Sequence, residues 1–355
     1  MAGSILPTVN RQVLLRRRPV GAPTNDDFSI VDSAVRDVRD GEVVRRTIYL
    51  SLDPYMRGRM NEARSYAKPV ALGEVMVGGT VSEVIQSRDP AFTPGDLVLG
   101  MDGWQSLAVS APTNLRKLDP NVAPISTALG VLGMPGLTAY VGLLDIGQAR
   151  SGETVVVSAA SGAVGSAVGQ IARLKGCRAV GIAGSREKCH YVVNDLKFDA
   201  AVNYKDGNLV HALREACPNG IDVYFDNVGG AVLAAAIRLI NRGARIPLSG
   251  QISNYNATEP PVGPNLVPLI VNRALIRGFL ASDHFDRYEA FLKDCGAWVR
   301  SGELRYREDI VEGLDNAPQA FIGLLEGRNF GKLLVRVSPD PTRPVVTPGL
   351  QTRAT

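Results

Sequence analysis

The feature that most constrains the fold is the stretch from Thr154 to Arg173, which reads TVVVSAASGAVGSAVGQIAR. An apolar β-branched run enters a short turn of small residues, and a helical pattern of small and apolar residues follows. This order is typical of a dinucleotide-binding unit, because a pyrophosphate binds unpaired N–H groups at a helix N-terminus and approaches the backbone closely. Gly162 and Gly165 give the necessary clearance, although Ala160 replaces the first glycine of the common G-x-G-x-x-G fingerprint. A glycine-rich turn without function remains the alternative for these letters alone.

Two patterns divide the rest of the chain. With 355 residues, 45% of them hydrophobic, the sequence can form two domains or one large one. Residues 1 to about 130 contain short β-prone runs separated by Asp-Pro, Pro-Gly and Gly-Gly turns. From about residue 135, strands alternate with helical segments, which predicts βαβ units and a parallel sheet with helices on both faces.

The expected elements follow from these patterns. Strands are expected at residues 42–50, 75–85, 96–99, 155–157, 178–183, 200–202, 221–225, 244–248 and 274–279. Helices are expected at residues 137–144, 186–195, 209–217, 231–240 and 288–299. A strand at 306–311 leads out of the parallel sheet, and a helix at 318–325 with a strand at 332–337 returns to the first region. The proline-rich end from residue 341 reads as a flexible tail.

Charge and cysteine content exclude several classes of protein. The net charge of +4 is mild, and we expect the short runs at residues 16–18 and 45–46 to be solvated surface rather than a nucleic-acid patch. The four cysteines lack C-x-x-C spacing, which argues against a disulfide framework or a metal knuckle. No signal-peptide pattern and no long apolar run occurs, so we expect a cytoplasmic protein that binds neither membrane nor nucleic acid.

The end of the second parallel strand indicates which dinucleotide binds. An NAD site usually has an acidic side chain there to bond the ribose hydroxyls. Here the segment 183–188 reads AGSREK, with no acid at its tip. Ser185, Arg186 and Lys188 favour a 2′-phosphate instead, which predicts NADPH rather than NADH. Ordinary polar residues that open a helix are the alternative.

Several blocks, taken in order, resemble a known family. They are SLDPYMR at 51–57, GMPGLTAY at 133–140, the glycine turn, FDNVGG at 225–230 and NFGK at 329–332. They are similar to the zinc-independent branch of the medium-chain dehydrogenases/reductases, in particular to leukotriene B4 12-hydroxydehydrogenase/prostaglandin reductases, alkenal double-bond reductases and curcumin reductases. The resemblance implies an α/β protein with a GroES-like β-rich catalytic domain, residues 1–130 completed by 312–340. It also implies a Rossmann doubly wound NADP-binding domain, residues 131–311, and a homodimer.

The distribution of metal ligands is consistent with this branch. Residues 1–176 contain neither cysteine nor histidine, so the first region has no soft ligand for a catalytic zinc. The histidines all fall in or beside the nucleotide region, at helical positions that favour surface or packing roles: His190, His211 and His284. We therefore expect no metal.

Without a metal, the chemistry depends on hydride geometry and a hydroxyl group. Reduction of an α,β-unsaturated carbonyl adds hydride to the β-carbon, and charge develops on the carbonyl oxygen. Tyr255 follows the expected strand 244–248, and carboxyl ends of parallel strands face the ligand. The resemblance implies that this tyrosine bonds the substrate carbonyl and the nicotinamide ribose; packing within a loop is the alternative.

The resemblance also implies further site residues, with core packing as the rival role for each. Tyr55 and Met134 would line the substrate pocket. The cofactor would contact Gly162, Ala163, Val164, Gly165, Ser185, Lys188, Tyr204, Asn227, Tyr255, Phe279, Leu280 and Asn329. Gly79 stands where the plant double-bond reductases have a tyrosine, so the pocket shape is not transferable.

The favoured activity is NADPH-dependent reduction of the C=C bond in lipophilic enones and enals, which are small-molecule substrates. A quinone oxidoreductase shares the same fold and the same independence of zinc. Oxidation of a secondary alcohol is the reverse chemistry. A sensor that binds NADPH without turnover is the non-enzymatic alternative.

Overall fold

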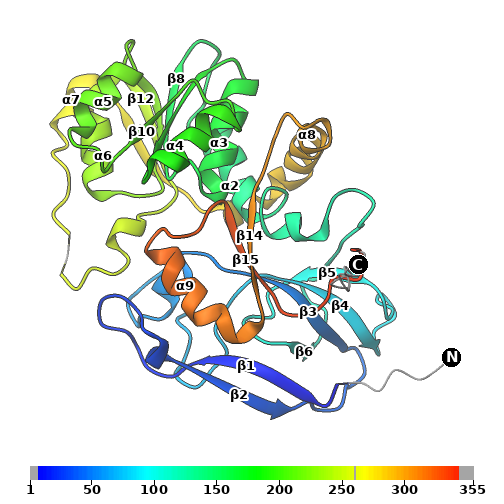
Figure 1. Ribbon diagram of the computed structural model, residues 1–355. Coiled ribbons are helices and arrows are strands. Elements are labelled where there is room, and N and C mark those ends of the chain that lie inside the picture. The colour runs from blue at the N-terminus through cyan, green and yellow to red at the C-terminus, as the bar shows by residue number, and fades with distance from the viewer. Residues whose placement is uncertain (1–6, 260, 344–355) are drawn as a thin grey trace, which may run out of the picture.

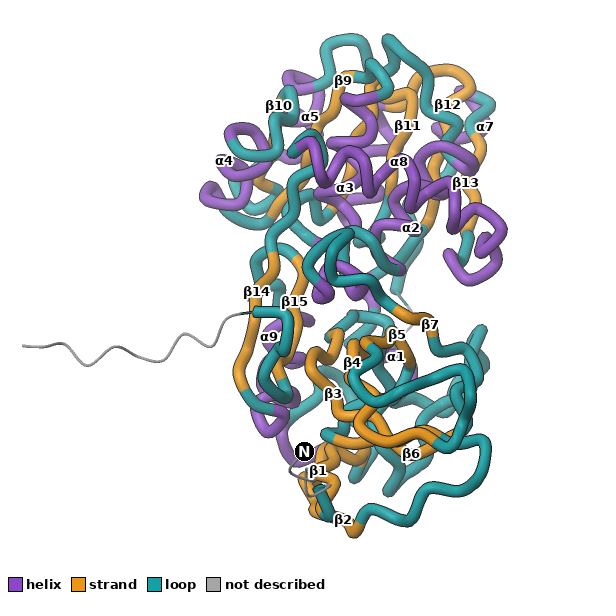
Figure 2. Tube along the Cα trace, turned by 90° about the vertical axis from the view of Figure 1, so that its right-hand side faces the viewer, coloured by secondary structure: helices purple, strands orange, loops and turns teal. Residues whose placement is uncertain are grey.

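The computed structural model describes residues 7–259 and 261–343. Their strands form one six-stranded sheet, one seven-stranded sheet and a separate two-stranded hairpin. Figures 1 and 2 show the six-stranded sheet and its helices as one lobe, stacked on a second lobe that holds the other two sheets. We call them the parallel-sheet lobe, residues 134–301, and the mixed-sheet lobe, residues 7–117 and 308–340.

Six strands, all paired in parallel, form the first lobe in the order β10-β9-β8-β11-β12-β13. They are β8 (Thr154–Ser158), β9 (Arg178–Ala183), β10 (Ala200–Asn203), β11 (Ile221–Phe225), β12 (Ile240–Leu248) and β13 (Leu275–Gly278). The chain order reverses between β8 and β11, and ligands of such sheets bind at that switch point, beyond the carboxyl ends of the strands.

Helices cover both faces of this sheet because its central strands are apolar on both sides. Val155 and Val157 of β8 belong to one core cluster with residues of α2, α3 and α8. Val156 points the other way, into a cluster with residues of α5 and α6. The helices are α2 (Met134–Val141), α3 (Ala163–Leu174), α4 (Arg186–Asn194), α5 (Leu209–Ala216), α6 (Gly230–Ala236), α7 (Val267–Asn272) and α8 (Tyr288–Ser301). The expected alternation of strands and helices is confirmed.

Both ends of the chain contribute to the mixed-sheet lobe. Its larger sheet has the order β14-β15-β3-β4-β5-β7, with β6 also paired to β3. The strands of this lobe are β1 (Val9–Leu15), β2 (Phe28–Ala34), β3 (Val43–Ser51), β4 (Thr80–Ser87), β5 (Leu97–Gly100), β6 (Leu107–Ser110), β7 (Arg116–Lys117), β14 (Glu308–Glu312) and β15 (Lys332–Arg336). Helix α9 (Ala317–Leu325) packs Phe321 against Trp104 with ring centroids 5.6 Å apart, and α1 (Met56–Arg59) follows β3.

The return to the mixed-sheet lobe comes earlier than the sequence predicts. The strand expected at 306–311, as the exit from the parallel sheet, is β14, and it pairs in parallel with β15. Residues 308–312 therefore lie in the seven-stranded sheet, where their backbone pairs with β15 and not with β13. Of the expected tail, Thr342 is still bonded to buried Asp340, and residues 344–355 lie outside the described part.

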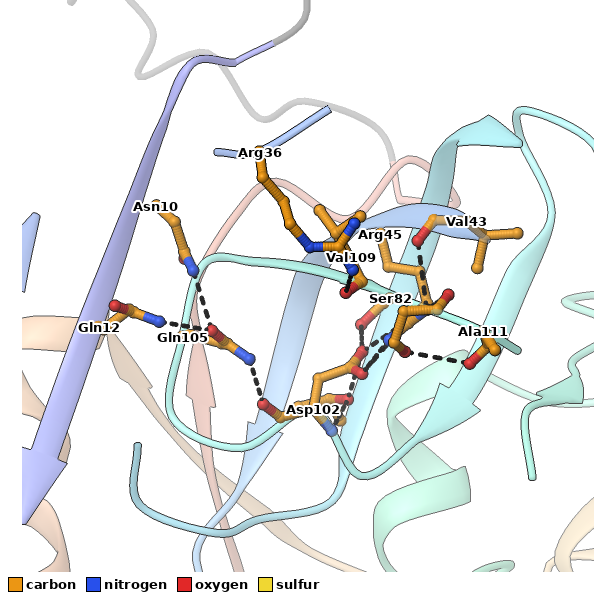
Figure 3. Close-up of polar contacts among 12 residues, drawn as sticks. Asn10, Gln12, Arg36, Val43, Arg45, Ser82, Asp102, Gln105, Val109 and Ala111 are labelled. Atoms are coloured by element: carbon orange, nitrogen blue, oxygen red, sulfur yellow. Dashed lines mark hydrogen bonds and ion pairs between the residues drawn. The ribbon is translucent and has the colours of Figure 1, made fainter. Parts of the chain in front are cut away.

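The arginine pair at 45–46 was expected on the solvated surface, and for Arg45 this is wrong. Arg45 is 2% exposed and forms an ion pair with Asp102 inside the mixed-sheet lobe. Ser82 also donates to Asp102 (Figure 3). Thr80 donates to the same carboxylate. A charge without solvent needs such partners, so this network orders β3 and β4. Within the described ranges, no helix has the length and apolar character needed to cross a bilayer.

Candidate active site

The turn after β8 has the geometry of a phosphate cradle. Its backbone reverses at Ala159, which has φ 52°, and Gly162 then caps α3. The N–H groups of the first helical turn, from Ala163 to Gly165, have no carbonyl partner within the helix. A Cβ on Gly165 would lie 2.3 Å from the Ala159 carbonyl oxygen, whereas one on Gly162 would meet only that oxygen, at 3.2 Å. Gly165 thus permits the tight turn, and Gly162 leaves open space in front of the helix.

The alanine in place of the first fingerprint glycine is accommodated by a neighbouring strand. Ala160 is fully buried, and its methyl group points at Gly181 of β9. A Cβ on Gly181 would lie 2.7 Å from the Ala160 Cβ, so these two positions hold only one methyl group between them. The altered fingerprint therefore forms the same strand–turn–helix unit.

The tip of β9 brings three predicted cofactor residues together. Ser185 caps α4 by accepting a bond from the Lys188 N–H at 3.2 Å. The Lys188 ammonium donates to the Gly327 carbonyl at 2.7 Å, and burial followed by the charge of Lys205 lowers its pKa. The Tyr204 ring stands over Gly184, where a Cβ would lie 3.0 Å from it. Ser185, Lys188 and Tyr204 therefore surround one exposed corner of the sheet.

Arg186 directly follows Ser185 and begins α4. Its side chain is 90% exposed and lies 3.5 Å from Asp206. The guanidinium of Arg307 lies 4.0 Å above the ring centroid of Phe330, and Lys188 contacts the same ring at 5.9 Å. Sequence reasoning missed Arg307, because this cluster forms only when residues that are distant in the chain meet.

Asn227 and Asn329, two of the predicted cofactor residues, form hydrogen bonds close to the ends of the parallel strands. The Asn227 amide donates to the Ser158 carbonyl at 2.8 Å and joins the ends of β11 and β8. The Asn329 amide donates to the Gly331 carbonyl at 2.9 Å, and the Gly331 N–H donates to the Ser161 carbonyl at 3.1 Å. The segment before β15 is therefore tied to the glycine turn.

A buried carboxylate supports this edge, and the sequence reasoning missed it. Asp226 is fully buried and accepts bonds from Ser158, Tyr224 and the N–H groups of the loop that follows. Its charge, after burial, also raises the pKa of Tyr224 well above the usual value. The signal that could have found it is the acid at a strand end directly before Asn-Val-Gly-Gly.

Tyr255 follows β12 and belongs to the same edge. Its hydroxyl lies 3.3 Å from where a Cβ on Gly250 would stand, and burial raises its pKa. The phenol is therefore protonated at neutral pH and available as a donor. At the end of β13, Phe279 packs edge-on against Phe225 at 6.1 Å, so its ring serves the core. Its main chain and that of Leu280 remain at the strand end.

The mixed-sheet lobe contributes the opposite wall. Burial raises the pKa of Tyr55, with further contributions from Asp53 and Tyr66. Asp53 itself is held by Lys332, whose ammonium lies 2.7 Å away. Burial, followed by the charge of Tyr255, also raises the pKa of Tyr66, which the sequence reasoning missed. Tyr55, Tyr66 and Tyr255 come from three separate segments of the chain.

Two further side chains border this wall. Arg59 follows Tyr55 by one helical turn, and its Nε is buried without an acceptor in the part of the chain that the structure describes. Met134 begins α2 and is 47% exposed, as a pocket-lining residue would be. Among the described residues, no group of three or more histidine, cysteine, aspartate or glutamate side chains could hold a metal ion.

Comparisons with known proteins agree with this arrangement. A family model described as the N-terminal domain of oxidoreductase matches residues 11–118, and one described as zinc-binding dehydrogenase matches residues 163–295. The chain is 50% identical to the NADPH-dependent curcumin reductase of Escherichia coli K12, covering 93% of this chain and 98% of the relative. The chain belongs to the medium-chain dehydrogenase/reductase family.

Other relatives of this family narrow the branch. Prostaglandin reductase 1 of Bos taurus is 44% identical, over 91% of this chain and 97% of its own length. The NADP(+)-dependent 2-alkenal reductase of Nicotiana tabacum is 42% identical, over 93% and 98%. The resemblance seen in the motifs is therefore confirmed, and so is the fold class of a GroES-like domain with a Rossmann domain.

Solved structures support the same architecture. CurA from Vibrio vulnificus in complex with NADPH superposes with a TM-score of 0.90 at 50% identity, covering 93% of this chain and 100% of that one. The quinone oxidoreductase of Escherichia coli in complex with NADPH gives a TM-score of 0.74 at 18% identity, covering 92% and 99%, which shows the fold alone.

Proposed function

We propose that this protein is an NADPH-dependent reductase of the C=C bond in α,β-unsaturated ketones and aldehydes. The observation that carries the proposal is the convergence of a phosphate cradle, a cationic corner and protonated phenols at one edge of the parallel sheet. Three relatives named for reduction of curcumin, prostaglandins and 2-alkenals support the same reaction class.

The residues at the sheet edge fit NADPH. The open space before Gly162 and the N–H groups of Ala163, Val164 and Gly165 suit a pyrophosphate. Ser185, Lys188 and Tyr204 would hold the 2′-phosphate, since an ammonium and a hydroxyl are ligands for a phosphate dianion. The remaining contacts would come from side chains and main chain at the other strand ends: Asn227, Tyr255, Phe279, Leu280 and Asn329.

The chain's own residues would then control the substrate. When bound, NADPH supplies the hydride for the β-carbon. Tyr255 is protonated at neutral pH, as an ordinary phenol is, and burial raises its pKa further. Its hydroxyl donates a hydrogen bond to the carbonyl oxygen and stabilises the charge that develops there. Tyr255 or water gives the proton to the α-carbon. Tyr55 and Met134 wall the pocket and exclude water from it.

The organisation of the chain is part of the proposal. The catalytic domain comprises residues up to about 130 and is completed from residue 308, while the NADP-binding domain lies between. A cytoplasmic location fits the four cysteines, all of which are free thiols in the structure.

A homodimer is supported by the outer strand of the parallel sheet. β13 ends the strand order, and beside it Val267, Ile270 and Val271 of α7 are 56–76% exposed. An exposed apolar strand edge is a template for pairing with a second copy of the same strand. Light scattering should give twice the chain mass, and Ile270→Glu should give monomers; a monomeric wild-type protein would contradict this part.

One assay tests the activity. Loss of NADPH absorbance is followed with 3-nonen-2-one, 2-nonenal and quinones, and its gain from NADP+ is followed with secondary alcohols. NADH and NAD+ serve as the controls. We expect saturable oxidation of NADPH by the enone and the enal, with little use of NADH. Turnover of quinones alone would identify a quinone oxidoreductase, and binding of NADPH without any turnover would identify a sensor.

A further inference from the structure

The buried side chain of Arg57 connects the two lobes. Three of its four hydrogen-bond partners belong to the mixed-sheet lobe: the Pro19 carbonyl at 3.3 Å, the Gly21 carbonyl at 2.8 Å and the Asn61 amide oxygen at 2.6 Å. The fourth is the amide oxygen of Asn256, at 3.2 Å, in the parallel-sheet lobe. Arg57 is 2% exposed, and its bond to the Pro19 carbonyl is buried, while the other three bonds are partly buried.

The Arg57–Asn256 bond lies beside two candidate substrate residues in the sequence. Arg57 follows Tyr55 by two residues on α1, and Asn256 directly follows Tyr255. The bond therefore joins the two backbone segments that carry the candidate pocket wall and the candidate donor. Arg57 and Asn256 are 199 residues apart in the chain, so the bond joins segments that the sequence alone does not bring together.

We propose that Arg57 is a positioning residue, which through Asn256 holds Tyr255 opposite Tyr55 so that both phenols meet the same substrate. The inference rests on the proposed enone reduction for its kinetic consequence. Its structural consequence is that the Arg57–Asn256 bond orders the segments on both sides of it, and this does not depend on any activity.

Three of the four bonds of Arg57 lie within one lobe and the fourth joins the lobes. This division distinguishes a positioning role for Arg57 from ordinary packing. The three bonds within the mixed-sheet lobe allow the turn around α1 to fold without Asn256, and the bond to Asn256 adds a restraint on that turn from the other lobe. Asn256 lies in a loop, partly exposed, where the loss of one side chain has little effect on stability. Loss of the bond between the lobes should instead misplace the Tyr255 hydroxyl, and a displacement of about 1 Å is enough to slow a reaction strongly.

The test removes the acceptor and leaves Arg57 in place. In Asn256→Ala we expect kcat/KM for 3-nonen-2-one to fall about 10-fold, with NADPH affinity within about twofold of wild type. Asn254→Ala is the matched control, because Asn254 bonds Gln251 and Ser253 within the same loop. That control should change kcat/KM by less than about threefold.

Two further measurements decide between positioning and packing. Asn256→Asp retains an acceptor for the guanidinium and should restore kcat/KM, whereas a role of the amide N–H would leave kcat/KM impaired.

Hydrogen exchange of the peptides 53–62 and 250–259 should accelerate in both peptides in Asn256→Ala, but only in peptide 250–259 in Asn254→Ala. Unchanged exchange of 53–62 in Asn256→Ala would overturn the proposal even if the protein reduces no enone. Wild-type kcat/KM in Asn256→Ala, with enone reduction present, would overturn it as well.

Discussion

The two sides of the cleft are built in different ways. The cofactor side uses consecutive strand–turn–helix units, in which a Cβ on Gly165 or Gly181 would lie within 3 Å of a neighbouring atom. The substrate side takes Tyr55, Tyr66 and Tyr255 from three separate segments, and the Arg57–Asn256 bond joins the segments of Tyr55 and Tyr255. The cofactor side is therefore rigid and local, and the substrate side depends on how the two lobes are held together.

The largest expected effect lies on the rigid side. Gly165→Ala would place a Cβ 2.3 Å from the Ala159 carbonyl oxygen, so the turn must open. We expect NADPH affinity to fall more than about 100-fold, and the free energy of unfolding to fall by about 2 kcal/mol. Titration of NADPH fluorescence and urea unfolding measure the two quantities. Gly263→Ala is the matched control, because a Cβ there meets nothing within 4 Å; equal affinities for the two variants would contradict the cradle.

The same contrast explains what could be predicted from sequence. Strands at 178–183 and 221–225 match β9 and β11 in both bounds, because each is a local apolar run between turns. The glycine turn and Ser185 could also be predicted, because each belongs to a short local pattern. Arg57 with Asn256, Tyr66 and the buried Asp226 network were not, since their roles arise only when distant segments meet. β14 was misassigned because its partner, β15, lies twenty residues farther along the chain.

On the substrate side, the largest single effect is expected from Tyr255. Tyr255→Phe removes the proposed donor to the carbonyl oxygen and leaves the ring. We expect kcat/KM for the enone to fall about 10- to 100-fold, with NADPH affinity unchanged, because water can replace part of the donor's role. Steady-state kinetics and NADPH titration measure this. Tyr306→Phe, a half-buried phenol away from the sheet edge, should behave as wild type; wild-type turnover in Tyr255→Phe would exclude Tyr255 from the mechanism.

A smaller effect is expected on the cofactor side, at Lys188. Lys188→Met removes the ammonium expected at the 2′-phosphate, and we expect NADPH affinity to fall about 10-fold while NADH affinity stays the same. Since burial lowers the pKa of Lys188, the charged form is lost as pH rises through that lowered value. Wild-type NADPH affinity should therefore decline at alkaline pH more steeply than that of Lys188→Met. Lys293→Met, on the exposed face of α8, is the control, and equal losses for NADH and NADPH would refute the assignment.

The smallest effect tests β14, a strand of the mixed-sheet lobe that carries none of the predicted site residues. Burial raises the pKa of Glu308, and its Oε1 lacks a partner within the described ranges, although Oε2 accepts from Ser126 at 2.9 Å. A carboxyl with a raised folded-state pKa favours the folded state when protonated, so this contribution is lost as pH rises through that pKa. Glu308→Gln should therefore stabilise the protein by about 1 kcal/mol at neutral pH, and the gain should vanish below the pKa of an unfolded glutamate. Urea unfolding between pH 4 and pH 8 measures the difference in the free energy of unfolding. Unchanged NADPH affinity and kcat/KM would confirm that β14 affects neither side. A stabilisation that is independent of pH would contradict the role of the Glu308 charge.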